Sequence, residues 1–370
     1  MKSKFFPALA VLIGTTIGAG FLGIPYVVGK SGFLPGLAYL IFVACFILLV
    51  KLYLGEISLR TKENSQLTGY AKRYLGKSGK ILMFFAMVVG VYSALLAYLI
   101  GEGYSLSYVI FGNFNYSLHL SLAFWFIMLF FTYTGLRALK KYEKIAMVFV
   151  LSIVLLILIF FFKGIKLENL SYIDKGYMFI PFGVIVFSFL AFSAMPEVER
   201  ILYGQEKKMK KVIFLGVLIP FLVYLIFTLI VVGNFNGNVN EIATLSLGRF
   251  FSVLGVLTMF TAFFTHTLAI RDMFRFDFKL GRFNGWLLAS FIPLFLFLLT
   301  YFLKLASFVQ ILSFGGIVSG GLTGILILIM NLRAKKLGNR KPEYSVKINK
   351  LIIFLLSLIF VVAVLLEVLY

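Results

Sequence analysis

The feature that most constrains this chain is the recurrence of long apolar segments along its whole length. Hydrophobic residues make up 61% of the 370 residues and charged residues only 13%, with a mean hydropathy of +1.03, whereas soluble domains average about 25% charged residues. A helix of about 20 residues crosses the ~30 Å hydrocarbon core of a bilayer. We therefore expect an all-α polytopic membrane protein with a single membrane domain over residues 1–370. Eleven transmembrane helices are expected at residues 5–29, 33–54, 81–111, 118–135, 144–163, 177–201, 211–233, 246–270, 284–303, 305–331 and 350–369.

The net charge of +21 is distributed unevenly between the two sides of this predicted topology. Loops on the side of the N-terminus hold 29 Lys and Arg, including seven in the 51–80 connection, and the opposite side holds 6. Because basic loops stay in the cytoplasm, we expect a cytoplasmic N-terminus, an extracellular C-terminus and a location in the cell membrane. The charge is thus a topology signal and does not indicate nucleic-acid binding. A short surface helix is expected around Leu67–Leu75.

Reactive side chains are scarce. Cys45 is the only cysteine, and His119 and His266 are the only histidines, so the sequence indicates neither a disulfide nor a Cys or His metal centre. No predicted span holds a HExxH motif, a GxSxG motif or a pair of aspartates. We therefore expect no enzyme activity and no cofactor.

The first apolar segment contains an unusual run, Gly14-Thr-Thr-Ile-Gly-Ala-Gly-Phe-Leu-Gly-Ile-Pro25. Glycine weakens a helix by about 1 kcal/mol relative to alanine, and proline by about 3 kcal/mol. Several such residues at mid-depth favour an interrupted helix, which a membrane tolerates only where the freed backbone faces protein, water or a ligand. The alternative is an unbroken helix in which Gly14 and Gly18 form a GxxxG packing face.

The sixth segment repeats this pattern in the opposite direction. Phe187-Ser-Phe-Leu-Ala-Phe-Ser-Ala-Met-Pro-Glu197 places small and polar residues and then a proline inside a span. Two interrupted helices five segments apart suggest an inverted repeat of residues 5–163 and 177–331, followed by an additional helix at about 350–369. Paired breaks of this kind mark transporter binding sites, which favours the interrupted helix over the packing motif.

The residues of both breaks resemble a known family. The Gly14–Gly20 run followed by Ile24-Pro25 and Gly32-Phe33, and the Ala-Met-Pro-Glu197 ending of the sixth segment, are similar to the amino acid/auxin permease family of the amino acid-polyamine-organocation superfamily. They are most like its bacterial and archaeal aromatic and hydroxy amino acid permeases. The resemblance implies a leucine-transporter-like fold of five plus five inverted helices, with an amino acid bound between the two breaks. Glycine is absent from the sixth-segment break here, which leaves its position open.

An amino acid substrate presents a carboxylate and an ammonium group to such a site. The N–H groups of Ala19 and Gly20, at the start of the outer half-helix, would bind the carboxylate. Carbonyls at Thr16 and in the Phe187–Ala191 stretch would bind the ammonium group. Selectivity for the side chain would come from Ser188, Leu190, Ala191, Tyr98 and Glu102. Glu102 is an intramembrane carboxylate and therefore a functional candidate, although a structural role beside Tyr98 is an equal alternative.

The coupling ion is either Na⁺ or H⁺. By resemblance, Na⁺ would lie between the carbonyls of Gly14 and Ile17 and the hydroxyls of Thr258 and Thr261, since hard cations prefer oxygen ligands. Those threonines would alternatively bond only to their own helix backbone. Proton coupling through Glu102 or His266 stays open. The expected function is import of a neutral, aromatic or hydroxylated amino acid by symport, and the alternative is a permease-like sensor or germinant receptor that binds an amino acid without transporting it.

Overall fold

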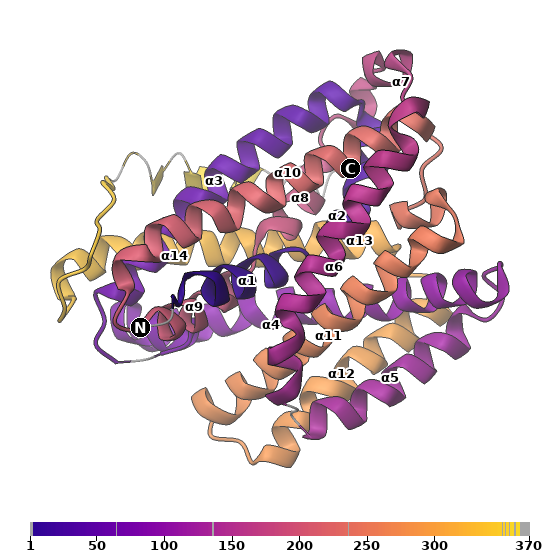
Figure 1. Ribbon diagram of the computed structural model, residues 1–370. Helices are drawn as coiled ribbons and strands as arrows, with labels where there is room; N and C mark the ends of the chain where they lie inside the picture. Colours follow the sequence, from indigo (N-terminus) through magenta and orange to yellow (C-terminus); the bar gives the residue numbers. More distant parts are fainter. Residues whose placement is uncertain are drawn as a thin grey trace.

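The computed structural model describes residues 3–362 apart from 64, 135, 136, 236, 350, 352, 355 and 359, and for residues 137–147 it describes the backbone alone. In this part of the chain every regular element is helical (Figure 1). The α-helices are α1 Phe5–Thr16, α2 Gly20–Ser31, α3 Phe33–Leu59, α4 Leu67–Phe111, α5 Ser117–Thr134, α6 Arg137–Phe161, α7 Leu167–Ser171, α8 Pro181–Phe189, α9 Met195–Leu202, α10 Met209–Phe235, α11 Arg249–Asp277, α12 Arg282–Leu303, α13 Phe308–Gly315 and α14 Gly321–Leu337.

Most of these helices have the length and apolar composition of membrane spans. Among the described residues, eight helical stretches pass that test alone, and α1 with α2 forms a ninth span that is bent. The all-helical polytopic expectation is therefore confirmed. The backbone of α6 follows the predicted fifth segment, and the described residues between 351 and 362 are helical. The rest of the helix expected at 350–369 lies outside the described residues, so the total of eleven crossings stays a prediction.

The third predicted segment begins earlier than expected. α4 starts at Leu67, and Gly76 interrupts it with a left-handed backbone (φ 80°), a conformation that glycine adopts at little cost. The turns before Gly76 are the surface helix expected around Leu67–Leu75, which is confirmed. The sequence expectation was wrong about Lys51, which was counted in the 51–80 loop but lies inside α3 with its side chain fully buried.

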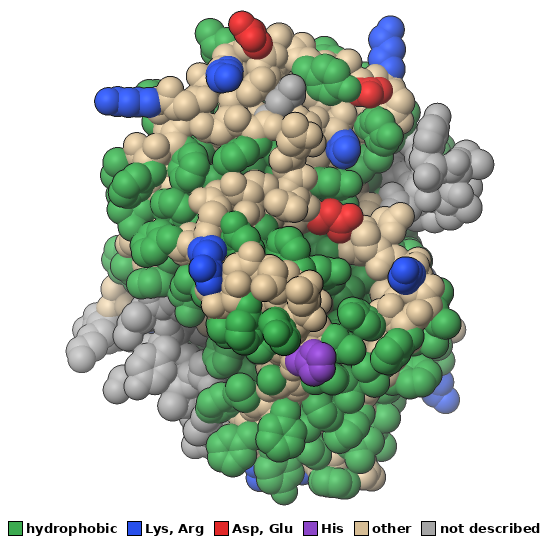
Figure 2. Space-filling model, turned by 90° about the vertical axis from the view of Figure 1, so that its right-hand side faces the viewer, with side chains coloured by type: hydrophobic (Ala, Val, Ile, Leu, Met, Phe, Trp, Pro, Cys, Tyr) green, Lys and Arg blue, Asp and Glu red, His purple; other side chains and the backbone are tan. Residues whose placement is uncertain are grey.

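Large apolar side chains cover the outside of the bundle. Figure 2 shows one face, on which hydrophobic side chains dominate and charged ones are sparse. Phe126 on α5 and Phe302 on α12 are 70% and 67% exposed. Apolar exposure over the whole outside of a bundle is unfavourable in water. It is expected of helices whose outer faces contact lipid.

The interior is organised around the broken helices. α10 packs against α1, α2 and α3, and α4 packs along α11 and α5; Figure 1 shows α3 and α10 running side by side. The halves of the two broken helices pair with each other, α2 with α8 and α1 with α9. The two interruptions are therefore neighbours in the middle of the bundle.

The first break falls within the glycine-rich run. α1 ends at Thr16, α2 begins at Gly20, and the two are bent by 50°. Ile17 leaves the helical region (φ −82°, ψ 77°). A Cβ atom placed on Gly14 would have no neighbour within 4 Å, so Gly14 does not form a tight packing face. The interrupted helix is confirmed over the packing motif.

The second break is the point that the sequence left open. α8 ends at Phe189, and Leu190 and Ala191 connect it to a short 3-10 turn, Phe192–Ala194, and then to α9. Ala191 adopts a left-handed conformation (φ 41°), which costs an alanine about 1–2 kcal/mol. Pro196 lies in the first turn of α9, where its missing N–H group has no helical acceptor to lose.

Candidate functional site

A small cavity of about 60 Å³ lies between the two breaks. Seven of the nine residues predicted to bind substrate line it: Thr16, Gly20, Tyr98, Phe187, Ser188, Leu190 and Ala191. Ala19 and Glu102 are not in the lining. The cavity wall also includes Ser319 and Thr323, which the sequence analysis did not single out.

The cavity continues toward the basic side of the protein. A second cavity of about 140 Å³ shares Thr15, Met87, Ser193 and His266 with the first and extends to Arg200 and Asp272 among others. Another cavity, of about 1000 Å³, shares no lining residue with these two and has mainly apolar walls, including Phe42, Leu96 and Phe314. It lacks backbone groups freed by either break, so we place the candidate site in the two smaller cavities.

The start of α2 presents free backbone donors. Among the described residues, the N–H groups of Ala19 and Gly20 donate to no backbone carbonyl, as expected for the first turn of a helix. Gly20 is required by close approach, because a Cβ atom there would lie 2.8 Å from the Cα atom of Ser188. The predicted anion-binding end therefore abuts the backbone of α8.

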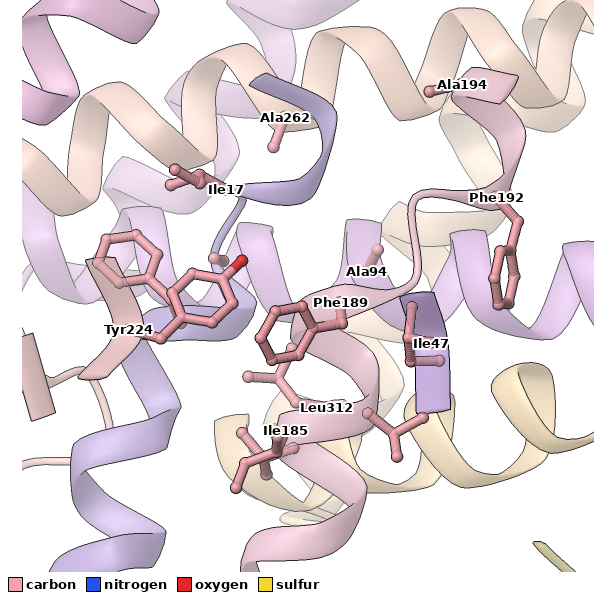
Figure 3. Packing of buried hydrophobic residues seen from close by; sticks show 14 of the residues in the cluster. Ile17, Ile47, Ala94, Ile185, Phe189, Phe192, Ala194, Tyr224, Ala262 and Leu312 are labelled. Carbon is pink, nitrogen blue, oxygen red and sulfur yellow. The ribbon is translucent and has the colours of Figure 1, made fainter. Parts of the chain in front are cut away.

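Tyr224 on α10 links the two breaks, and the sequence analysis missed it. Its hydroxyl lies 2.8 Å from the carbonyl oxygen of Thr16, at the end of α1, and 2.8 Å from that of Ser188, near the end of α8. One hydroxyl proton can serve one of these acceptors at a time. The ring lies between Phe21 and Phe189, with centroid distances of 5.9 and 4.9 Å, and Figure 3 shows it between the segments that carry Ile17 and Phe189.

Tyr98 closes the first break from the side of α4. A Cβ atom on Gly18 would lie 3.0 Å from its hydroxyl oxygen, and its ring makes an edge contact with His266 at 5.7 Å. His266 itself bonds through Nδ1 to the Ala262 carbonyl, at 2.9 Å. This pair forms the wall between the cavity and α11.

Glu102 lies one helical turn beyond Tyr98, toward the end of α4. It is fully buried, and both carboxylate oxygens have no hydrogen-bond partner among the described residues. Ser105 and Thr244, whose hydroxyls both lie near Gly255, are likewise buried and without partners. Buried polar groups are normally satisfied, and these three belong to a small set of exceptions among the described residues. They are separate from the cavity lining.

The four residues proposed for Na⁺ lie on α1, on the break and on α11. Gly18 is within contact distance of Ala262, 3.5 Å from a Cβ position to its Cβ atom, which brings the break next to Thr261. Thr258 donates to Leu254 at 2.9 Å and Thr261 to Leu257 at 3.1 Å, both within their own helix. The threonines thus bond to their own helix backbone, which was the alternative to Na⁺ binding. Each hydroxyl oxygen still has a lone pair that could accept a cation. The carbonyls of Gly14 and Ile17 stay predicted ligands.

The buried Lys51 amine is a second functional group that the sequence analysis missed. Its Nζ atom lies 3.4 Å from the Thr16 hydroxyl, at the end of α1. The only available signal was a lysine inside the apolar run of the second segment, three residues before its predicted end at residue 54. That position was compatible with an interfacial lysine, which is why it was assigned to the loop.

Known proteins resemble this chain in sequence and in fold. Tyrosine-specific transport system 2 from Haemophilus influenzae is 25% identical over 352 residues, which are 86% of this chain and 85% of that protein. Glutamine transporter 2 from Aliivibrio fischeri is 27% identical over 248 residues, which are 64% of this chain and 63% of that transporter, so this match spans less than two thirds of its length. The solved structure of Mhp1, a nucleobase-cation-symport-1 family transporter with bromovinylhydantoin bound, has a TM-score of 0.63 at 14% identity, covering 87% of this chain and 77% of that one. That likeness shows a shared transporter fold.

A family model gives the assignment. The model described as the tryptophan/tyrosine permease family matches residues 1–245, which include both breaks and α10. This match confirms the aromatic permease part of the expected resemblance, whereas the amino acid/auxin permease name stays a prediction. Because the matched region is more than half of the sequence, the chain belongs to the tryptophan/tyrosine permease family.

Proposed function

We propose that this protein is a secondary active transporter that imports a neutral, aromatic or hydroxylated amino acid by alternating access. Membership of a permease family and the tyrosine-specific relative from Haemophilus influenzae support amino acid transport. The single observation that carries the proposal is the cavity between the two helix breaks. Backbone groups freed by a break are tolerated inside a membrane where they bind something.

The two ends of an amino acid match the two kinds of backbone group at this cavity. The start of α2 offers N–H donors and the positive end of a helix dipole, which suit a carboxylate. The ends of α1 and α8 offer carbonyls, which suit an ammonium group. The Tyr224 hydroxyl lies 2.8 Å from one carbonyl oxygen of each end. By donating to either of the two, it would hold the ends at a fixed spacing. Phe187, Leu190 and Tyr98 provide apolar surface for an aromatic side chain.

The expected topology is part of the same proposal. Eleven crossings, five plus five inverted helices, a cytoplasmic N-terminus and an extracellular C-terminus are supported by the opposed breaks and by the basic loops. The count of those loop cations becomes 28 after Lys51 is removed, against 6 on the other side. The second cavity, which reaches Arg200 and Asp272, would then be the release path to the cytoplasm.

Substrate counterflow in proteoliposomes tests the proposal, because exchange of labelled for unlabelled substrate requires no ion gradient. Vesicles preloaded with each of the twenty amino acids in turn are expected to take up the same labelled amino acid, with tyrosine, tryptophan or phenylalanine strongest. Within this set, glutamine is the main comparison because of the glutamine-transporter relative. Absence of saturable counterflow with all twenty would refute the transport function, and binding without counterflow would favour the sensor.

A further inference from the structure

Lys51 is an unusual lysine for its position. It lies on α3 eight residues before the end at Leu59, which is about 12 Å along the axis. Its side chain is fully buried. Ionisable residues inside membrane spans are rare, and they are functional candidates by default.

The Nζ atom is directed to the end of α1. Its hydrogen-bond partner is the Thr16 hydroxyl, at 3.4 Å. That hydroxyl donates its own proton to the Leu12 carbonyl, at 2.7 Å, so it is available to Nζ as an acceptor. Thr16 is the last residue of α1, where the negative end of the helix dipole favours a cation. A charged amine is thus stabilised by dipoles at this place.

Among the described residues, no carboxylate pairs with the Lys51 amine. Three ionisable groups on α3 or on the helices packed against it have other partners. Tyr224 on α10 bonds to Thr16 and Ser188 carbonyls, Glu199 on α9 accepts from the Tyr70 hydroxyl, and Glu56 on α3 itself binds Arg60 and, from α14, Lys335. Burying an unpaired ion costs several kcal/mol. The charge on Lys51 is therefore sensitive to how far water and dipoles reach it.

The hydrogen-bond partner of Lys51 lies in the wall of the cavity between the breaks. Thr16 lines the cavity between the breaks, and this cavity shares Thr15, Met87, Ser193 and His266 with the one that extends to Arg200 and Asp272. The Thr16 side chain therefore contacts both Nζ and a cavity that continues toward Arg200 and Asp272. A different opening of the breaks would change both the hydration of Nζ and the dipoles at the end of α1.

We propose that Lys51 is the proton-coupling residue of this transporter, an inference that rests on the proposed function. The Nζ lone pair takes up one proton when the site faces outside, where the charged amine stabilises the end of α1. It releases that proton to the second cavity, which extends to Arg200 and Asp272, after the substrate has crossed. Because the proton has different affinity for the two states, its gradient shifts the population between them. Na⁺ is then not required as the coupling ion.

The test measures accumulation driven by a pH gradient relative to counterflow in the same proteoliposomes. With one proton per substrate, a gradient of one pH unit should drive about tenfold accumulation by the parent protein. Lys51→Met is expected to lose this accumulation and to retain counterflow. The same substitution at the exposed surface residue, Lys72→Met, should accumulate like the parent.

Lys51→Arg separates proton transfer from a structural positive charge. Arginine keeps its charge at any accessible pH. It can therefore substitute for a lysine that only supplies positive charge, but not for a lysine that binds and releases a proton. We expect Lys51→Arg to exchange substrate without pH-driven accumulation. The rival carriers are tested by Glu102→Gln and His266→Gln, for which the ratio of pH-driven accumulation to counterflow should stay that of the parent.

Three results would overturn the inference. The first is tenfold pH-driven accumulation in Lys51→Met or Lys51→Arg. The second is a fall in the ratio of pH-driven accumulation to counterflow in Glu102→Gln or His266→Gln but not in the Lys51 variants. The third is accumulation that is driven by a Na⁺ gradient and is reduced by Thr261→Ala. Counterflow in the parent with any of these results would refute proton coupling at Lys51 while leaving transport intact. Absence of counterflow in the parent would instead refute the transport function, and this inference with it.

Discussion

The two helix breaks perform the same structural task with different residues. The first break, between α1 and α2, lies in a run that contains Gly18 and Gly20. The second, at Leu190 and Ala191, contains no glycine, and an alanine adopts the left-handed backbone there. Close approach requires glycine at position 20, because a Cβ atom there would lie 2.8 Å from the Ser188 Cα atom. A Cβ atom on Gly18 would lie 3.0 Å from the Tyr98 hydroxyl oxygen. The second break thus contains a residue with a strained backbone, whereas the first has glycine where a side chain would clash.

The difference shows that a broken membrane helix can be maintained from outside as well as by its own sequence. At the second break, the Ser188 carbonyl near the end of α8 is bound by Tyr224 from α10. The same hydroxyl reaches Thr16 at the first break. One such hydrogen bond, together with the packing of Tyr224 on Phe189, is enough to offset a strain of about 1–2 kcal/mol at one residue.

The largest expected effect is at the close approach of the two breaks. Gly20→Ala places a methyl group against the Ser188 backbone, and overpacking of this kind costs about 1–3 kcal/mol. We expect a roughly 5- to 150-fold loss of apparent substrate affinity in counterflow. Gly14→Ala adds the same methyl group into open space and keeps the backbone carbonyl, so its effect should be much smaller. Equal behaviour of the two variants would mean that contact between α2 and α8 does not define the site.

Removal of the shared hydroxyl should have an intermediate effect. Tyr224→Phe keeps the ring between Phe21 and Phe189 but removes the hydrogen bond to the two carbonyls, worth about 0.5–1.5 kcal/mol. Apparent affinity should fall about 2- to 13-fold, and the melting temperature in detergent should fall with it. The exposed Tyr301 offers a control, Tyr301→Phe, that should change neither quantity. Unaltered transport in Tyr224→Phe would show that each break is maintained independently.

The smallest effect is expected at the strained residue. Ala191→Gly relieves about 1–2 kcal/mol of left-handed strain and adds about 0.5–1 kcal/mol of backbone entropy to the unfolded chain. The net gain should be about 0.5 kcal/mol in the free energy of unfolding, measured by SDS titration. Ala289→Gly, inside the regular helix α12, should have the opposite sign, a loss of about 1 kcal/mol. Destabilisation by Ala191→Gly would show that the second break is unstrained.

Local composition was enough to predict much of the fold and part of the site. Apolar segments long enough to cross a bilayer, and the glycines and proline of the first one, act within a few residues along the chain. An interruption within the Gly14–Pro25 run followed from them, and the structure places it at Ile17. Seven predicted residues line the cavity because both breaks were recognised. The residue at which the second helix breaks was not predictable, since alanine has no local preference for the left-handed backbone that Ala191 adopts.

Tyr224 and Lys51 required the tertiary structure. Each is an ordinary residue in its own segment, a tyrosine in an apolar helix and a lysine near a predicted helix end. Their roles depend on contacts with Thr16, 208 and 35 residues away in the sequence, and such separations are set by how helices pack. The sequence alone determined that two helices break inside the membrane, because glycine, proline and missing backbone bonds are local properties. Packing of α3 and α10 against those breaks decided which hydroxyl bridges them and which amine lies beside them.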